Sequence, residues 1–270
     1  MEMTPLAVQS LAALLERATG QQLVAGRRWR IETALAPVMR AHGIETLEAL
    51  AARIGRRDCA LGHSVIEAML NHETSFFRDV ASFRLFIDEG LAAIAKLRAT
   101  DKRLRIWSAG CSTGQEAYSL ALALRRQAER WHGWEINILG TDVSELAVAQ
   151  ARDGLYSQLE IQRGLPIGEM IACFEPEGEN WRAKAALRQM VKFRQHNLLD
   201  LPPAGKFDVV LCRNVLLYFS EARQREVFGR LAEAIAPEGL LMLGAGETVL
   251  DHTDLFVSDP ELRGFYRRLA

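Results

Sequence analysis

The residues best suited to chemistry in this sequence lie in a glycine-containing loop, Gly110-Cys111-Ser112-Thr113-Gly114, and just after it. A short apolar run precedes the loop, and apolar residues at helical spacing follow it. A strand, a glycine loop and a helix in this order make the first crossover of a nucleotide-binding sheet. Glycine lets a ligand approach the backbone, and the start of the helix offers free N–H groups. The alternative is a tight turn that binds nothing, because two glycines spaced in this way are a weak motif.

The residues around this loop narrow the kind of ligand. The glycines do not follow the G-x-G-x-x-G spacing of a dinucleotide site, and no Gly-Lys-Ser/Thr sequence marks a P-loop. The next charged residue is Glu116, and its carboxylate would repel a phosphate and attract a cation. S-adenosylmethionine (SAM), which carries a sulfonium and an ammonium group, is such a ligand.

A second carboxylate, Asp142, follows the next predicted strand. In folds of this kind, an acidic side chain at this position usually holds the hydroxyl pair of a ribose. The alternative role is the N-cap of the following helix, but Ser144 would serve that role equally well.

The elements that position these residues alternate between strand and helix, which predicts an α/β fold with a Rossmann-like parallel sheet. Residues 154–195 interrupt the alternation and predict a small inserted β-subdomain, in which 189–194 is expected to be a half-solvated antiparallel strand. Two late β-like runs predict a terminal antiparallel hairpin, which is typical of SAM-dependent methyltransferases. The expected strands are 104–109, 136–141, 207–212, 239–244, 255–257 and 264–268, and the expected helices are 115–130, 144–152 and 221–236.

The first hundred residues contain no strand-like alternation and predict helices only. We expect a helical N-terminal domain over 1–80, a linking helix over 81–100, and a SAM-binding domain over 101–270. The helices in the first part are expected near 4–20, 26–42, 46–54, 61–71 and 80–97.

Charge and cysteine usage exclude several classes of protein. The 33 Lys and Arg residues nearly balance the 34 Asp and Glu residues, so no overall field favours nucleic acid. No apolar run approaches the ~20 residues that cross a bilayer. The cysteines form no C-x-x-C pair, which indicates reduced thiols in a cytoplasmic protein, and no side-chain cluster has the spacing of a metal site.

Several motifs in this chain together resemble the CheR-type chemotaxis methyltransferases, over nearly its whole length. The resemblance implies transfer of a methyl group from SAM to glutamate side chains of bacterial chemoreceptors, with S-adenosylhomocysteine (SAH) as product. It implies the cytoplasmic helical region of those receptors as partner, without nucleic acid or membrane insertion, and we expect a monomer. The motifs are H-E-T-S-F-F-R-D at 72–79, the G-C-S-T-G-Q-E loop, N-L-L at 197–199, C-R-N-V-L-L-Y-F at 212–219, Gly246-Glu247 and Phe265-Tyr266-Arg267.

The resemblance also implies roles for single residues. It puts Arg78 and Tyr218 closest to the transferred methyl group, as catalytic residues. Many relatives have Asn-Glu-Thr where this chain has His72-Glu73-Thr74, and Asn71 lies one place earlier, so either Asn71 or His72 faces the cofactor. The residues that it assigns to cofactor binding are His72, Thr74, Arg78, Gly110, Glu116, Asp142, Asn197, Leu198, Arg213 and Asn214.

Methyl transfer to a carboxylate needs alignment more than proton transfer. A free glutamate has a pKa of about 4.3, so the nucleophile is already ionised near pH 7. Alignment of the two reactants can contribute ~7–11 kcal/mol. Arg78 or Arg213 would keep the carboxylate charged, and Tyr218 would orient an oxygen. Without the resemblance, Arg78 could instead pair with Asp79, Tyr218 could be a core aromatic, and Asn197 could cap a turn.

Other functions remain as alternatives: a non-enzymatic SAM-binding or receptor-docking module, or a methyltransferase of this fold with another protein as substrate. A nucleic-acid methyltransferase is disfavoured, because the charge is balanced and no proline-aromatic loop follows the strand at 207–212. We expect SAM to lie between the two domains. We also expect the second helix to read the receptor with Trp29, Arg30 and Arg40, and with Ile31, Leu35 and Val38 buried.

Overall fold

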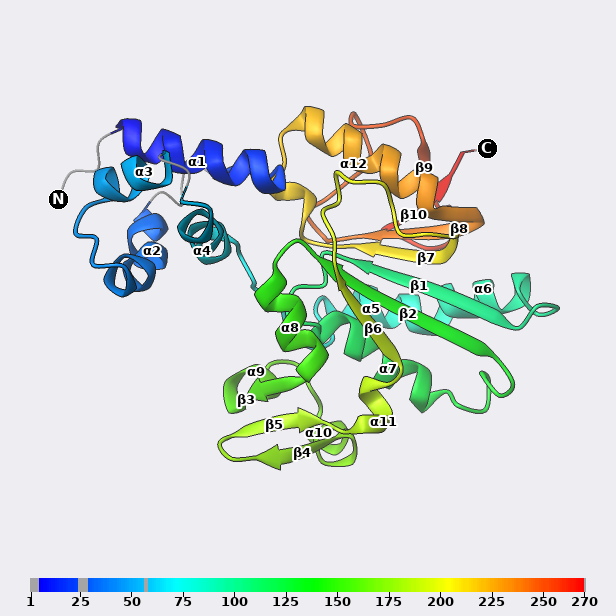
Figure 1. The fold of residues 1–270 in the computed structure, drawn as a ribbon. Helices are drawn as coiled ribbons and strands as arrows, with labels where there is room; N and C mark the ends of the chain where they lie inside the picture. The colour runs from blue at the N-terminus through cyan, green and yellow to red at the C-terminus, as the bar shows by residue number, and fades with distance from the viewer. Residues whose placement is uncertain (1–4, 24–28, 56–57, 270) are drawn as a thin grey trace. The chain divides into compact units, whose positions relative to one another are not determined.

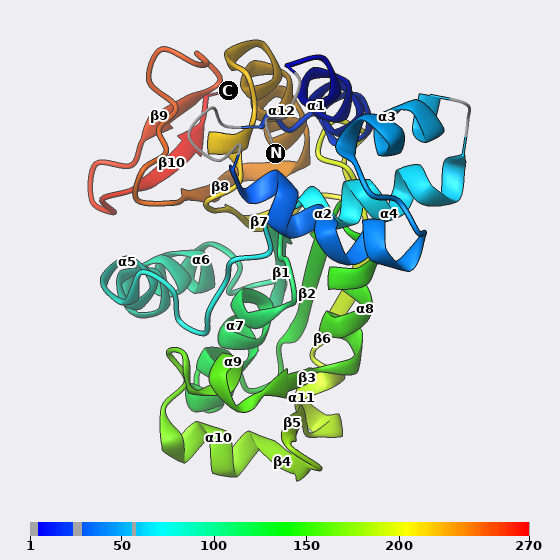
Figure 2. The same cartoon turned by 90° about the vertical axis from the view of Figure 1, so that its left-hand side faces the viewer.

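The computed structural model describes residues 5–23, 29–55 and 58–269, shown as a ribbon in Figure 1 and from the side in Figure 2. The chain divides into two compact units. The helical unit comprises Met1–Asn71 and Tyr218–Arg223, and the sheet unit comprises His72–Leu217 and Gln224–Ala270. No helix among the described residues has the length and apolar character that crossing a membrane requires.

The helical unit confirms the helices predicted from the sequence. α1 ends where Gly20 takes a φ of +77°, a conformation that glycine adopts at low cost. Along the second helix, Ile31 and Leu35 are buried and Val38 packs against the same core, as the apolar spacing predicted. The side chains of Trp29 and Arg30 lie outside the described part. The helices are α1 (Pro5–Thr19), α2 (Trp29–Ala41), α3 (Leu47–Gly55) and α4 (Cys59–Met69).

The sheet unit is built on a seven-stranded sheet with the order β6-β2-β1-β7-β8-β10-β9. The first five strands in this order run parallel, while β10 is antiparallel to both β8 and β9, so the predicted terminal hairpin is confirmed. All residues of β7 are buried, as expected for a central parallel strand, and the one charged residue, Asp208, pairs with Arg98. The strands are β1 (Arg103–Ala109), β2 (Glu135–Asp142), β6 (Val191–Gln195), β7 (Phe207–Cys212), β8 (Ile235–Leu243), β9 (Phe256–Ser258) and β10 (Phe265–Arg268).

The helices of the sheet unit cover this sheet. α7 and α8 both lie against β2 and β6, and the apolar face of α7 enters the main core. The helix expected over 80–97 forms with a π-helical turn, η2, in its middle. These helices are α5 (Val80–Leu85), η2 (Phe86–Gly90), α6 (Leu91–Leu97), α7 (Gln115–Arg126), α8 (Glu145–Asp153) and α12 (Glu221–Ala234), which belongs to the sheet unit from Gln224 onward; η3 (Leu216–Tyr218) is a single 3₁₀ turn.

The inserted subdomain is a three-stranded antiparallel sheet of order β3-β5-β4 with short helices beside it. The expectation of an antiparallel strand at 189–194 is wrong, because β6 pairs in parallel with β2 at the edge of the main sheet. The polar-apolar alternation arose because Val191 and Phe193 are buried while Lys192 and Arg194 are exposed. The insert contains β3 (Leu155–Ser157), α9 (Gln158–Gln162), α10 (Ile167–Cys173), β4 (Phe174–Glu177), β5 (Asn180–Ala183) and α11 (Ala185–Arg188).

A glycine makes the contact between this insert and residues 72–79. Gly164 has a φ of +92°, and a Cβ at this position would lie 2.0 Å from the carbonyl oxygen of Phe76. We expect Gly164→Ala to destabilise the protein by about 1–3 kcal/mol, through left-handed strain and overpacking. Urea unfolding measures this loss. The matched control is Gly168→Ala in α10, where a Cβ meets no atom within 4 Å and helix propensity favours alanine. Equal effects of the two changes would contradict the contact.

Candidate active site

The predicted site residues of the sheet unit gather at the carboxyl ends of adjacent parallel strands. Gly110 follows β1, Asp142 ends β2, and Arg213 follows β7. The chain passes from β1 to β2 on one side, while β7 lies on the other side of β1. Ligands of open α/β sheets bind outside the strand ends at such a switch in strand order.

The glycines of the loop are required by close contacts within the protein. Gly110 has a φ of +81°, and a Cβ there would lie 2.4 Å from Cγ2 of Val215 in the loop after β7. Gly114 has a φ of +94°, and its Cβ would lie 2.8 Å from the Cβ of Ala151 in α8. The backbone N–H groups of Gly110 and Cys111 both donate to the carbonyl of Thr141 at 2.8 Å. The loop is therefore held tightly against its two neighbours.

Asp142 is oriented by backbone donors on both of its carboxylate oxygens. Ser112 N–H donates to Oδ2 at 2.8 Å and Ser144 N–H donates to Oδ1 at 3.0 Å. Asp142 is not the N-cap of α8, because Ser144 accepts the capping bond from the N–H of Ala147. These two bonds fix the position of the carboxylate at the end of β2.

Asn197 and Leu198 are brought beside Asp142 by the backbone. The N–H of His196 donates to the carbonyl oxygen of Asp142 at 2.8 Å. Asn197 Oδ1 accepts the N–H of Leu199 at 3.1 Å, which forms a turn, and Leu198 is buried. Asn197 therefore caps a turn, as the alternative interpretation of the sequence predicted.

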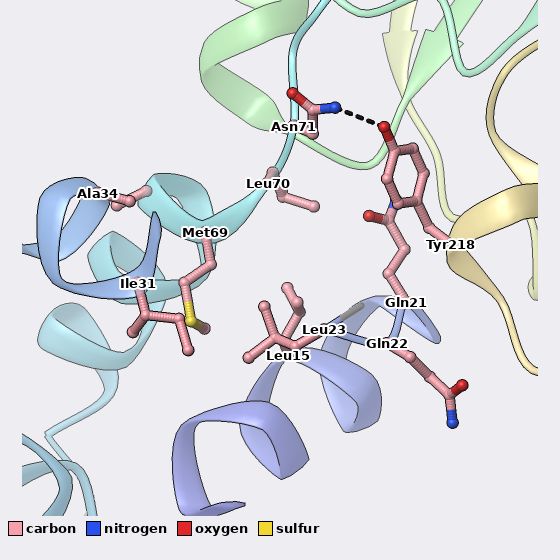
Figure 3. A pocket seen from close by; sticks show the side chains of 11 residues that line it. Leu15, Gln21, Gln22, Leu23, Ile31, Ala34, Met69, Leu70, Asn71 and Tyr218 are labelled. Carbon is pink, nitrogen blue, oxygen red and sulfur yellow. Dashed lines mark hydrogen bonds between the residues drawn. The ribbon is translucent and has the colours of Figure 1, made fainter. Parts of the chain in front are cut away.

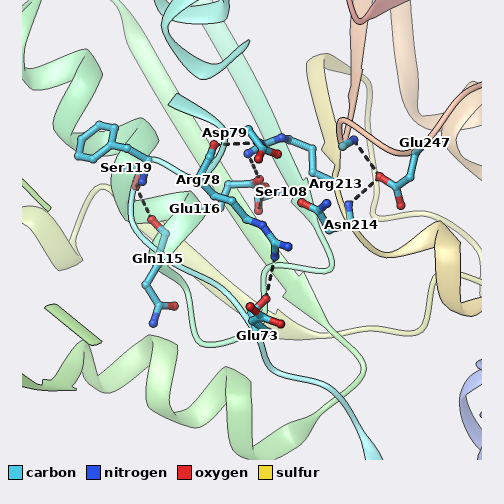
Figure 4. A network of polar contacts seen from close by, with 12 residues as sticks. Glu73, Arg78, Asp79, Ser108, Gln115, Glu116, Ser119, Arg213, Asn214 and Glu247 are labelled. Atoms are coloured by element: carbon cyan, nitrogen blue, oxygen red, sulfur yellow. Dashed lines mark hydrogen bonds and ion pairs between the residues drawn. The ribbon is translucent and has the colours of Figure 1, made fainter. Parts of the chain in front are cut away.

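Arg213 is the centre of a buried ion-pair network (Figure 4). Its side chain is 1% exposed. Nη1 donates to Glu116 Oε2 at 3.0 Å, and Nη2 donates to Asp79 Oδ2 at 2.8 Å. Nη2 also donates to the carbonyl of Arg78 at 2.9 Å, and the other oxygen of Glu116 accepts the hydroxyl of Ser108 at 2.7 Å. Both terminal nitrogens of Arg213 are thereby engaged within the protein.

Residues 72–79 are tied to the glycine loop and its helix at separate points. Ser112 Oγ donates to the carbonyl of His72 at 3.1 Å, and the N–H of Phe77 donates to Ser119 Oγ at 2.9 Å. Phe77 and Asp79 have φ values of +49° and +56°; aspartate tolerates this conformation, but it is strained for a bulky residue such as Phe77, and such strain often marks functional segments. The polar contacts hold this strained segment against α7.

The adjacent aromatics of the F-F-R motif have different partners. Phe76 is buried and makes edge contacts with Tyr156 and Phe174 of the insert, at ring-centroid distances of 5.2 and 5.7 Å. Phe77 makes an edge contact with Phe83, and the guanidinium carbon of Arg126 lies 5.1 Å from its ring centroid. The motif thus anchors the segment on two sides.

Arg78 is half-buried and donates from Nη1 to the carbonyl of Glu73 at 2.9 Å (Figure 4). Among the described residues, Asp79 pairs with Arg213 and not with Arg78, which was the alternative expected from the sequence. His72 and Thr74 are also half-buried. All three residues lie in the segment 72–79, which hydrogen bonds tie to the loops after β1 and β7.

Tyr218 lies in the helical unit, where Asn71 Nδ2 donates to its hydroxyl (Figure 3). The N–H of Gln22 donates to the Tyr218 carbonyl at 2.6 Å. The side chain is half-buried, whereas the neighbouring Phe219 is buried, so Tyr218 is not a core aromatic. Its ring lines a pocket of about 100 Å³ whose apolar lining includes Leu15, Ile31 and Met69.

The thiols near the strand ends are poor nucleophiles. Burial raises the pKa of Cys111 well above its usual value, and the carboxylates of Asp142 and Glu116 raise it further. Burial likewise raises the pKa of Cys212. Both groups stay protonated near pH 7, which agrees with the packing role expected from the sequence.

The polar groups at these strand ends fit SAM. Glu116 is a mostly buried carboxylate that suits an ammonium group, and Asp142 suits ribose hydroxyls. Asn214 Oδ1 is buried without a hydrogen-bond partner among the residues that the structure describes. Buried acceptors are normally satisfied, so this oxygen suits a donor on a ligand. One further residue, Glu247, was not predicted as a site residue and was noted only as part of the Gly246-Glu247 motif. Its carboxylate accepts the backbone N–H of Asn214.

Loss of Arg213 should destabilise the fold. Arg213→Met would leave the carboxylates of Glu116 and Asp79 without their counter-ion, and breaking such a buried pair costs about 3–5 kcal/mol. Denaturant unfolding measures the change. The control is Arg103→Met, whose ion pair with Glu135 is exposed and should be worth less than ~1 kcal/mol. A loss from Arg213→Met no larger than that of the control would contradict the network.

Comparison with known proteins agrees with this geometry. Residues 72–261 match the family model for the CheR methyltransferase SAM-binding domain. Chemotaxis protein methyltransferase 1 of Pseudomonas aeruginosa is 36% identical over 240 residues, which cover 87% of each chain. Chemotaxis protein methyltransferase Cher2 of Pseudomonas putida is 34% identical over 89% of this chain and 90% of its own. The chain therefore belongs to the CheR methyltransferase family, and it is a SAM-dependent methyltransferase.

Proposed function

We propose that this protein methylates glutamate side chains of bacterial chemoreceptors in the cytoplasm. The observation that carries the proposal is the tethering of residues 72–79, which contain Arg78, to the glycine loop beside Asp142 and, through Arg213, to Glu116 in α7. The guanidinium of Arg78, which can bind a substrate carboxylate, is thereby held in the same unit as Glu116 and Asp142, whose carboxylates can bind the cationic cofactor. The curated relatives are named for chemotaxis, and chemoreceptors are the protein substrates that such a name implies.

The chain's residues would act by alignment and electrostatics. SAM, when bound, supplies an electrophilic methyl group. Glu116 and Asp142 would hold its ammonium and ribose, and Thr74, His72, Asn197, Leu198 and Gly110 would line its site. Arg78 would pair with the substrate carboxylate, which attacks as the anion, so that no general base is needed. The carbon–oxygen bond forms as the carbon–sulfur bond breaks, and no proton is transferred.

We assign Tyr218 and Arg213 different roles in this mechanism. Tyr218, held through its hydroxyl by Asn71, would orient an oxygen of the substrate. Asn71 would thereby act through Tyr218, which leaves His72 for the cofactor side. Arg213 would be a positioning residue for Glu116 and for the Arg78–Asp79 backbone, because its terminal nitrogens are engaged there.

We further propose that residues 1–80 recognise the receptor, with 81–100 as linking helix and 101–270 as the catalytic domain, and that the protein acts as a monomer. A receptor region rich in methylatable glutamates is acidic, and complementary charge favours its association. On α2, Arg40 is exposed on the side away from buried Ile31 and Leu35.

The decisive experiment is methyl transfer from labelled SAM to purified receptor fragments, followed by mapping of the modified residue. Methyl esters on glutamate would support the proposal. Incorporation into another protein, or SAM binding without turnover on any receptor fragment, would favour the alternatives of another substrate or a docking module.

Tyr218→Phe should slow methyl transfer with little effect on stability. The change removes one hydroxyl from a half-buried ring and keeps its packing. Loss of one hydrogen bond of about 0.5–1.5 kcal/mol in the transition state should lower kcat by roughly 3- to 10-fold. The melting temperature and SAH affinity serve as internal controls and should stay near wild type. A normal kcat would reduce Tyr218 to a packing residue.

Charge reversal on α2 should weaken receptor recognition without affecting the cofactor. Combined Arg30→Glu and Arg40→Glu should raise the receptor KM several-fold at low salt and reduce the dependence of KM on ionic strength, because attraction to an acidic helix is lost. Arg268→Glu, an exposed arginine in β10, is the matched control. Unchanged receptor KM at both low and high salt would show that α2 does not bind the receptor.

A further inference from the structure

The carboxylate of Glu247 collects backbone N–H groups from two separate loops. Oε1 accepts from Val215 at 2.8 Å and from Leu216 at 2.7 Å. Oε2 accepts from Asn214 at 2.6 Å and from Gly244 at 2.8 Å. Glu247 lies in the turn after β8, whereas residues 214–216 follow β7 (Figure 4). A single side chain thus joins the ends of two parallel strands.

The surroundings of this carboxylate leave it little freedom. A Cβ on Gly244 would lie 2.6 Å from Glu247 Oε2 and 2.8 Å from the nitrogen of Asn214. The Glu247 N–H also donates back to the carbonyl of Gly244 at 3.0 Å. Hydrogen bonds to an ionised carboxylate are about twice as strong as neutral ones. The chain therefore builds a dedicated cradle for this one acidic group.

The loop that Glu247 holds carries residues of the active site. Asn214 has a φ of +60°, a left-handed conformation that asparagine adopts more readily than most residues other than glycine. Its side-chain Oδ1 is buried and has no partner among the described residues. Leu216, whose N–H binds Glu247, begins the turn η3, which ends at Tyr218. The loop thus contains a buried, unused acceptor, and the Glu247 contacts hold its backbone in place.

We propose that Glu247 is a positioning residue for the cofactor. Its carboxylate fixes residues 214–216 so that Asn214 Oδ1 faces a donor of SAM, either the ammonium group or a ribose hydroxyl. Its carboxylate accepts the N–H groups of the backbone, so Glu247 would act on the cofactor through Asn214. This inference rests on the proposed cofactor site at the strand ends. It predicts that loss of Glu247 lowers affinity for SAM and SAH by more than general destabilisation explains.

A second carboxylate in the same unit provides a matched control for a purely structural role. Asp259 accepts the N–H groups of Glu261 and Leu262 at 2.9 and 2.8 Å, and it pairs with Arg267. It holds the turn between β9 and β10, which contains none of the proposed site residues. Asp259→Asn removes the same kind of contact as Glu247→Gln.

The test compares SAH affinity by calorimetry and melting temperature for the full-length wild type, Glu247→Gln and Asp259→Asn. Glu247→Gln keeps the side-chain size but turns an amide N–H toward backbone donors. It should weaken SAH binding about tenfold or more, on the scale of one charged hydrogen bond, and raise the KM for SAM in parallel. Asp259→Asn should lower the melting temperature to a similar extent, while SAH affinity stays within about twofold of wild type.

Two results would overturn the proposal: SAH affinity of Glu247→Gln within about twofold of wild type, or an equal loss of affinity in Asp259→Asn. If Glu247→Gln does not fold, Gly244→Ala perturbs the same cradle without removing the charge, and wild-type SAH affinity in that variant would also reject the proposal. Failure of the wild-type protein itself to bind SAH would instead reject the proposed cofactor site.

Discussion

The structure of the active site depends on the compensation of one buried charge. Arg213 is almost completely removed from solvent, and a guanidinium in that position is stable only when its donors and charge are matched. Glu116 and Asp79 supply the carboxylates, and they come from the helix after the glycine loop and from the F-F-R-D segment. The ion pairs of Arg213 therefore bring together the loop after β7, the first turn of α7 and the segment 72–79 near the ends of the parallel strands.

The residues that follow Arg213 are held by the opposite arrangement of charge. There a carboxylate, Glu247, accepts backbone donors, so the loop after β7 has an ion-pair anchor at its start and a backbone anchor immediately beyond it. Val215 of this loop also packs against Gly110, which lies in the loop after β1. Rigid support of this kind fixes Asn214 in its left-handed conformation. Catalysis by alignment requires such support, because small misplacements of bound reactants are costly.

Periodicity along the chain predicted the parallel strands, the helices of both units and the terminal hairpin, since each depends on contacts that repeat over a few residues. The pairing of β6 escaped this reasoning. Val191 and Phe193 alternate with exposed Lys192 and Arg194, and this pattern records burial of one face but not the direction of the neighbouring strand. Strand direction is set by the crossover that connects β2 to β6, which no local pattern encodes.

The sequence by itself determined the fold class, the glycine loop, the acidic residues after β1 and β2, and the motifs that mark the family. These features depend on residue type and short spacing. Only the tertiary structure decided which polar groups face one another: Arg213 meets Glu116 and Asp79 across separations of 97 and 134 residues, and Glu247 meets Asn214 across 33. Type and spacing make Arg213 a candidate for binding a substrate carboxylate. The folded chain engages it internally instead, because two acidic side chains of the protein reach it when the strand ends come together.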